Sequence, residues 1–193
     1  MKTLIVKYLP TGESSNTKQI LDLFVKNLPN KNIEELDLLN AEIPMFNEKS
    51  IQAYYKRNYG GQVLDENEAK LLEQNDKLAT QLKSADILVM AYPMHNFGMP
   101  AKIKAWLDAV ILNGDTFSTT EKKMAGKKAL TIFTSGGVYS KDTFNFDYPN
   151  WNSIALSANS NFSFMGFDEN KIVGTSLRDE AKKAEALNNC ENE

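Results

Sequence analysis

The feature that most constrains the fold of this chain is a regular alternation between short apolar runs and longer amphipathic stretches. Residues 86–92 (DILVMAY) and 128–135 (KALTIFTS) carry apolar side chains at consecutive positions. A strand that is apolar on both sides must be covered on both sides, as in a parallel sheet between two layers of helices. The alternation therefore predicts an α/β protein built as a three-layer sandwich.

The remaining segments complete the predicted order of elements. We expect strands over residues 2–8, 33–38, 86–92, 128–135 and 170–176, and helices over residues 16–28, 66–84, 100–112, 150–165 and 178–189. The helices are predicted from apolar residues that recur at a spacing of three or four, and the strands from β-branched and apolar runs. Five parallel strands joined by right-handed crossovers give a sheet in the order 2-1-3-4-5 with helices on both faces.

The length of 193 residues and a hydrophobic content of 42% fit a single domain over residues 1–193. Residues 40–65 are the main irregular stretch, an excursion from the sheet that contains Tyr54, Tyr55, Tyr59 and a Gly60-Gly61 pair. This composition is compatible with a mobile lid, with part of a dimer surface, and with a long connector.

Composition also argues against several classes of partner. A net charge of −3 and a pI near 5.4 disfavour nucleic acid and anionic membranes. No apolar run approaches the ~20 residues of a membrane helix, and Lys7 interrupts the apolar start too early for a signal peptide. The single cysteine, Cys190, allows neither a disulfide framework nor a thiolate metal site. We therefore expect a cytoplasmic protein with no metal, membrane or nucleic-acid partner.

A ligand site is predicted where the strand order reverses, between the first strand and the third. Three loops meet there, over residues 9–17, 93–99 and 135–142. The first loop, LPTGESSNT, opens a helix with Ser14, Ser15, Asn16 and Thr17. Because a helix N-terminus presents free N–H groups and a positive partial charge, this loop suits a phosphate group. A plain N-cap is the alternative interpretation.

Stronger phosphate-binding patterns are absent from the sequence. Neither G-x-G-x-x-G nor G-x-x-x-x-G-K-[ST] occurs, which disfavours the usual dinucleotide and nucleoside triphosphate loops. No pair of acidic residues follows the first strand, as a phospho-accepting receiver domain would need.

The second loop has the composition of a site for an aromatic ring system. It comprises Pro93, Met94, His95, Asn96 and Phe97, followed by a glycine and an amphipathic helix with a proline expected in its first turn. His95 is the only histidine, so a hydrolytic triad lacks its parts. A solvated or hydrogen-bonded loop histidine is the alternative to a catalytic one.

The third loop begins Thr134-Ser135-Gly136-Gly137. Paired glycines after a buried strand let the backbone approach a ligand closely, although they are also ordinary turn residues. Three such loops at one end of the sheet are together stronger evidence for a ring-binding site than any one of them alone.

In these motifs the chain resembles the flavodoxin-like NAD(P)H-dependent FMN oxidoreductases, most closely the FMN-dependent NADH-azoreductase and quinone reductase family. The resemblance extends from Lys2 to about Leu177. Ser15-Asn16-Thr17 matches the S-x-S segment that holds the FMN phosphate in that family. Pro93-Met94-His95-Asn96-Phe97 matches the P-M-[YH]-N-F segment that holds the isoalloxazine ring. Ser135-Gly136-Gly137 matches the S-x-G-G segment at the other edge of the ring, one residue shorter.

The resemblance implies a flavodoxin-like fold and non-covalently bound FMN. It implies that NADH or NADPH delivers a hydride to the flavin, and that a quinone or azo compound then receives it in a ping-pong reaction. N–H groups near Asn96 and Gly136-Gly137 would donate to the ring, and Met94 and Phe97 would pack against it. His95 would bind the acceptor or supply a proton. Homodimers are expected, with the ring site at the subunit interface.

Three rival functions remain open from the sequence. A flavodoxin-type electron carrier would share the fold and cofactor, although such carriers usually have more acidic surfaces. A hydrolase of the acyl carrier protein phosphodiesterase type, a name that some relatives have carried, would need a metal cluster or an acid–base pair. A regulatory or stress-response flavoprotein is a third possibility.

Overall fold

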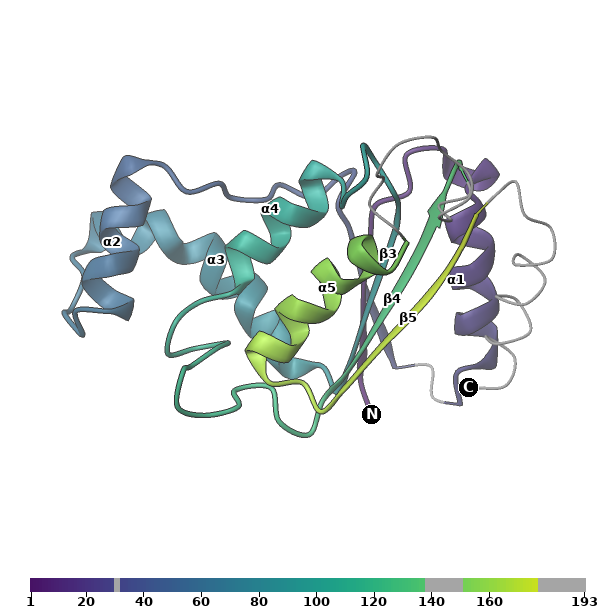
Figure 1. The fold of residues 1–193 in the computed structure, drawn as a ribbon. Coiled ribbons are helices and arrows are strands. Elements are labelled where there is room, and N and C mark those ends of the chain that lie inside the picture. The colour runs from purple at the N-terminus through teal and green to yellow at the C-terminus, as the bar shows by residue number, and fades with distance from the viewer. Residues whose placement is uncertain (30–31, 138–150, 177–193) are drawn as a thin grey trace.

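In the computed structural model, which describes residues 1–29, 32–137 and 151–176, the centre of the molecule is a parallel β-sheet. Its strands are β1 (Thr3–Lys7), β2 (Ile33–Asp37), β3 (Ile87–Pro93), β4 (Lys128–Ser135) and β5 (Glu169–Ser176), in the order β2-β1-β3-β4-β5. The predicted fold class and strand order are confirmed (Figure 1).

Helices cover both faces of this sheet. They are α1 (Asn16–Asn27), α2 (Glu48–Asn58), α3 (Glu66–Ser84), α4 (Ala101–Val110) and α5 (Trp151–Met165), and a single 3₁₀ turn, η1, spans Gly12–Ser14. Figure 1 shows α1 on one side of the sheet and α3, α4 and α5 on the other, with α2 outermost beside α3. Among the described helices, none has both the length and the apolar content needed to cross a bilayer.

The two faces follow from the period of two along each strand. On β1, Leu4 and Val6 point into the larger core with α3, α4 and α5, whereas Ile5 points toward α1. The side toward α1 also contains Leu130 and Ile132 of β4. All five side chains are at most 9% exposed, so the continuous apolar runs in the sequence reflect burial on both sides.

The prediction of an irregular stretch over residues 40–65 is wrong for its central part, which forms helix α2. Asn47 caps this helix: its side chain accepts from Lys49 N and Ser50 N, while Ser50 Oγ accepts from Asn47 N. This capping box stabilises a helix start that the tyrosine and glycine content obscured. Pro100 also differs slightly from expectation, because it is the N-cap of α4 and the first turn begins at Ala101. The predicted helix over residues 178–189 lies outside the described residues.

Polar contacts attach α2 to the helical layer rather than to the loops at the end of the sheet. The Arg57 guanidinium donates to both carboxylate oxygens of Asp76 in α3, at 2.7 and 2.8 Å. The Asn58 and Asn113 side chains each donate to the other residue's carbonyl oxygen, and Tyr54 Oη accepts from Asn113 N at 2.9 Å. A helix fixed in this way is part of the scaffold, which does not fit a mobile lid over residues 48–58.

Candidate functional site

The site predicted from the sequence lies at the carboxyl edge of the sheet, where β1 separates β2 from β3 and the strand order reverses. The loops after β1, β3 and β4 all leave the sheet at this edge because the strands are parallel. The structure therefore brings the starts of all three predicted loops to one rim.

The first loop is a short turn that leads into α1. Ser15 is the N-cap of the helix, and its hydroxyl accepts from Lys18 N at 3.2 Å, so the N-cap interpretation is confirmed for this residue. The N–H groups of Asn16 and Thr17 belong to the first turn, where helix geometry provides no intrahelical partner. Two backbone donors and the positive end of the helix dipole thus remain suitable for an anion.

Thr17 itself is fully buried, and its hydroxyl does not face solvent. Thr17 Oγ1 lies 2.8 Å from Thr134 Oγ1, at the end of β4. The sequence pattern placed Thr17 in a phosphate cradle but gave no indication of this partner, because Thr134 is 117 positions away.

The second loop is a tight turn with an unusual backbone. His95 N donates to Gly98 O at 3.0 Å, and Gly98 N donates to His95 O at 2.9 Å. The two residues between them, Asn96 and Phe97, have φ values of +46° and +64°. Positive φ at both central positions is the pattern of a type I′ turn, which strongly favours asparagine and glycine. Asparagine tolerates it, whereas phenylalanine is an unusual and strained occupant.

This turn exposes its ring and amide side chains at the rim. His95, Asn96 and Phe97 are exposed, whereas Met94 is half-buried and packs against the larger core. The ring of His95 makes an edge-on contact with Tyr8, with ring centroids 5.8 Å apart. Tyr8 follows β1 directly, a position that could have identified it as a residue of the site.

The third loop follows the buried end of β4. Ser135 is buried, and its Oγ donates to Gly137 O at 2.8 Å. Gly136 is exposed, and apart from its two chain neighbours no heavy atom of the described residues lies within 4 Å of the position that a Cβ would take there. The open space beside Gly136 would let a flat ligand approach the backbone. The rest of this predicted loop, residues 138–142, lies outside the described residues.

The segment between β2 and α2 forms another part of this rim that the sequence did not assign to the site. It runs past the N-terminus of α4 (Figure 1), where Lys102 Nζ donates to Ala41 O at 3.1 Å. Leu39 and Met45 of this segment are 42% and 78% exposed. Both side chains are exposed in a segment that passes the predicted site, and the positions of these residues in the sequence gave no indication of this.

The chemistry available in the described part of the site fits binding better than hydrolysis. Within the described ranges, no three His, Cys, Asp or Glu side chains are grouped so that they could hold a metal ion. Tyr92, at the end of β3, is buried and stacks on Phe133, and burial raises its pKa far above its ordinary value. This phenol therefore stays neutral and is not an acid or base near neutral pH.

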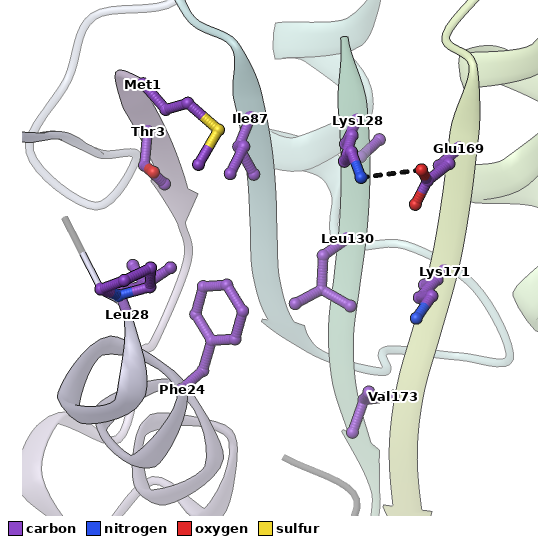
Figure 2. A pocket seen from close by; sticks show the side chains of 12 residues that line it. Met1, Thr3, Phe24, Leu28, Ile87, Lys128, Leu130, Glu169, Lys171 and Val173 are labelled. Carbon is purple, nitrogen blue, oxygen red and sulfur yellow. Dashed lines mark ion pairs between the residues drawn. The ribbon is translucent and has the colours of Figure 1, made fainter. Parts of the chain in front are cut away.

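A separate hollow of about 290 Å³ lies at the opposite end of the sheet. Figure 2 shows it between the end of α1, with Phe24 and Leu28, and the first residues of the strands. Lys128 and Glu169 form an ion pair of 2.7 Å on its wall. Because ligands of doubly wound sheets bind beyond the carboxyl ends of the strands, this hollow is not the predicted site.

Comparison with known proteins gives matches over most of the chain. The family model described as "Flavodoxin-like fold" matches residues 1–193. An FMN-dependent NADH:quinone oxidoreductase 1 of Bacillus cereus is 31% identical, over 92% of this chain and 89% of its own length. The protein of the same name in Bacillus anthracis is 30% identical, over 92% of this chain and 86% of its own length.

Solved structures give the same picture. An FMN-dependent NADH-azoreductase from Bacillus anthracis, determined in complex with FMN, superposes with a TM-score of 0.81 at 27% identity. The alignment covers 100% of this chain and 97% of that one. The likeness therefore extends over nearly the full length of both chains.

Proposed function

The chain belongs to the flavodoxin-like fold family, and from that premise we propose that it is an FMN-dependent oxidoreductase that transfers a hydride from NADH or NADPH to a quinone or azo acceptor. The observation that carries this proposal is the convergence of three loops at the reversal of strand order, one of them a strained turn that exposes a ring and an amide. Backbone strain of this kind is kept mainly at functional sites.

The described residues fit the two parts of FMN, its phosphate and its ring system, separately. The N–H groups of Asn16 and Thr17, the hydroxyl proton of Ser15 and the helix dipole would hold the phosphate at the first turn of α1. The β3–α4 loop, Pro93 to Phe97, would hold the ring system. Ser135, Gly136 and Gly137 would contact its other edge, where the space beside Gly136 is open. Bound FMN would supply the acceptance and release of a hydride.

The chain itself contributes position, electrostatics and exclusion of water. N–H groups of the second and third loops would donate to the polar edge of the ring and stabilise negative charge there. His95 is exposed beside Tyr8 and would bind the acceptor or hold a proton for it. Donor and acceptor would use the same open face in turn, which is the ping-pong order.

Purified protein tests this function directly. We expect it to bind added FMN, to show flavin absorbance that NADH bleaches, and to oxidise NADH continuously when a benzoquinone is present. An electron carrier of the flavodoxin type would bind FMN but oxidise almost no NADH under these conditions. A colourless protein that takes up no FMN would refute the proposal.

The hydrolase alternative receives no support from the described residues, because no three of their His, Cys, Asp or Glu side chains are grouped to hold a metal ion and the described parts of the loops bring no acid–base pair together. The names of the relatives favour the reductase over the carrier.

We further propose that the active form is a homodimer with the site at the subunit interface. Leu39 and Phe97 support this, since both are large apolar side chains, at least 42% exposed, in loops that leave the carboxyl edge of the sheet. Light scattering on the eluted protein should give twice the mass of 21.7 kDa, and a monomer mass would contradict the proposal. A cytoplasmic location is a further prediction, which cell fractionation tests.

A further inference from the structure

Two buried threonines occupy positions where the sequence pattern calls for apolar residues. On β4, Thr134 follows Leu130 and Ile132 on the side that faces α1. On α1, Thr17 precedes Ile20 and Leu21 on the buried stripe of the helix. Thr17 is 0% exposed and Thr134 3% exposed. Valine has nearly the same shape, needs no hydrogen bond, and suits a strand equally well.

The two hydroxyls satisfy each other, since Thr17 Oγ1 and Thr134 Oγ1 are 2.8 Å apart. Thr134 also contacts the second loop, because its carbonyl oxygen accepts from Met94 N at 2.7 Å. The residue after Thr134 begins the third loop. Thr134 therefore joins the first turn of α1, the start of the ring loop and the glycine pair.

Stability alone does not account for this pair. Replacing both partners of a buried hydrogen bond by apolar groups of the same shape is often neutral or stabilising. A hydrogen bond does, however, fix a direction and a distance that apolar contacts leave adjustable. The pair lies at the rim end of both elements, where α1 presents its free N–H groups.

We propose that Thr134 is a positioning residue, which acts through Thr17 to hold the anion-binding first turn of α1 at a fixed distance from the ring-binding loop. This inference rests on the proposed flavin site. A ligand that bridges an anion site and a ring site gains full affinity only if the two are already correctly spaced. FMN has both a phosphate and a ring, whereas riboflavin has the same ring without the phosphate.

The test compares the affinities of the apoprotein for FMN and riboflavin, measured by quenching of flavin fluorescence. We expect Thr134→Val to weaken FMN binding about three- to ten-fold and to change riboflavin binding by less than about two-fold. Thr134→Ser keeps the hydroxyl and should restore the affinity for FMN. The double variant Thr17→Val with Thr134→Val should melt close to the wild type, because no hydroxyl is left unpaired, yet bind FMN as weakly as Thr134→Val.

Thr131 provides a matched control in the same strand. It is fully buried on the other side of the sheet, and its Oγ1 has no hydrogen-bond partner among the residues that the structure describes. Thr131→Val should therefore leave the affinities for both flavins unchanged.

The outcomes separate this role from the function on which it rests. If the wild type binds FMN and Thr134→Val binds it equally well, or loses FMN and riboflavin affinity equally, the positioning role is refuted while the flavin site stands. If the wild type binds neither flavin, both proposals are refuted.

Discussion

The left-handed turn at His95–Gly98 predicts an unusual order of stability, in which a glycine variant is more stable than an alanine variant. Phe97 has a φ of +64° and is 43% exposed. Replacing it by alanine or by glycine removes the same ring and therefore the same contacts. Only alanine retains a Cβ, so the difference in stability between the two variants isolates the backbone strain at this position.

The magnitude follows from two opposing terms. A Cβ in the left-handed region costs about 1–2 kcal/mol, whereas glycine loses about 0.4–1 kcal/mol through the greater freedom of its unfolded chain. At position 97 the glycine variant should therefore be more stable than the alanine variant by about 0.5–1 kcal/mol. For a chain of this length, the difference corresponds to a melting temperature about 1–4 °C higher.

The assay is thermal or denaturant unfolding of the two apoproteins side by side. Met45 supplies the control, because it is an exposed loop residue without a positive φ. There only the entropy term acts, so Met45→Ala should be more stable than Met45→Gly by about 0.4–1 kcal/mol. The reasoning is refuted if alanine is also the more stable choice at position 97. Both variants at 97 should bind FMN more weakly, which would show that the strain is retained for the ring rather than for stability.

Four other predictions test the site and the scaffold. Gly136→Leu should melt like the wild type, because the space beside Gly136 is open, but weaken FMN affinity about ten-fold or more in a fluorescence titration; unchanged affinity would remove the third loop from the site. Thr17→Ala removes the hydrogen-bond partner of Thr134 Oγ1 and should weaken FMN binding about three- to ten-fold, and an equal dissociation constant would contradict the role of this residue at the phosphate-binding turn. His95→Tyr should retain bound FMN and change steady-state turnover with quinones, whereas complete loss of hydride transfer with FMN still bound would make the imidazole essential. Burial raises the pKa of Tyr54 from 10.0 to about 12, so the folded state favours the neutral phenol and stability should fall as pH rises from about 10 to about 12; Tyr54→Phe should reduce this fall in melting temperature, and an identical pH profile would refute it.

Helix α2 shows where prediction from the pattern failed. The excursion over residues 40–65 contains helix-capping residues, Asn47 and Ser50, but also tyrosines and a glycine pair that favour irregular structure. Contacts with distant residues favour the helix: Arg57 bonds Asp76, and Asn58 bonds Asn113. A local pattern carries no information about such partners, so the balance between helix and loop could not be determined from it.

The positions of the loops at the candidate site were easier to predict than α2, because their signals are local. A strand that ends in glycines, or a helix that opens with Ser15, can be recognised without knowing its neighbours. The strain at Phe97 could not be predicted, since the sequence around it does not resemble the Asn-Gly pair that usually marks a type I′ turn. Tyr8 was missed although its position directly after β1 could have identified it, whereas Ala41 was missed because no motif marks its contact with Lys102.

The amino-acid sequence by itself determined the layered α/β architecture and the order of the strands, and it predicted a ligand site at one edge of the sheet. Apolar periodicity and turn chemistry act over a few residues, and parallel strands then bring their carboxyl ends to one edge. Only the tertiary structure decided that Thr17 meets Thr134, that α2 attaches to α3, and that Phe97 adopts a left-handed backbone. Such pairings depend on the packing of segments far apart in the chain, where the energies of alternatives differ by little and the whole fold determines the choice.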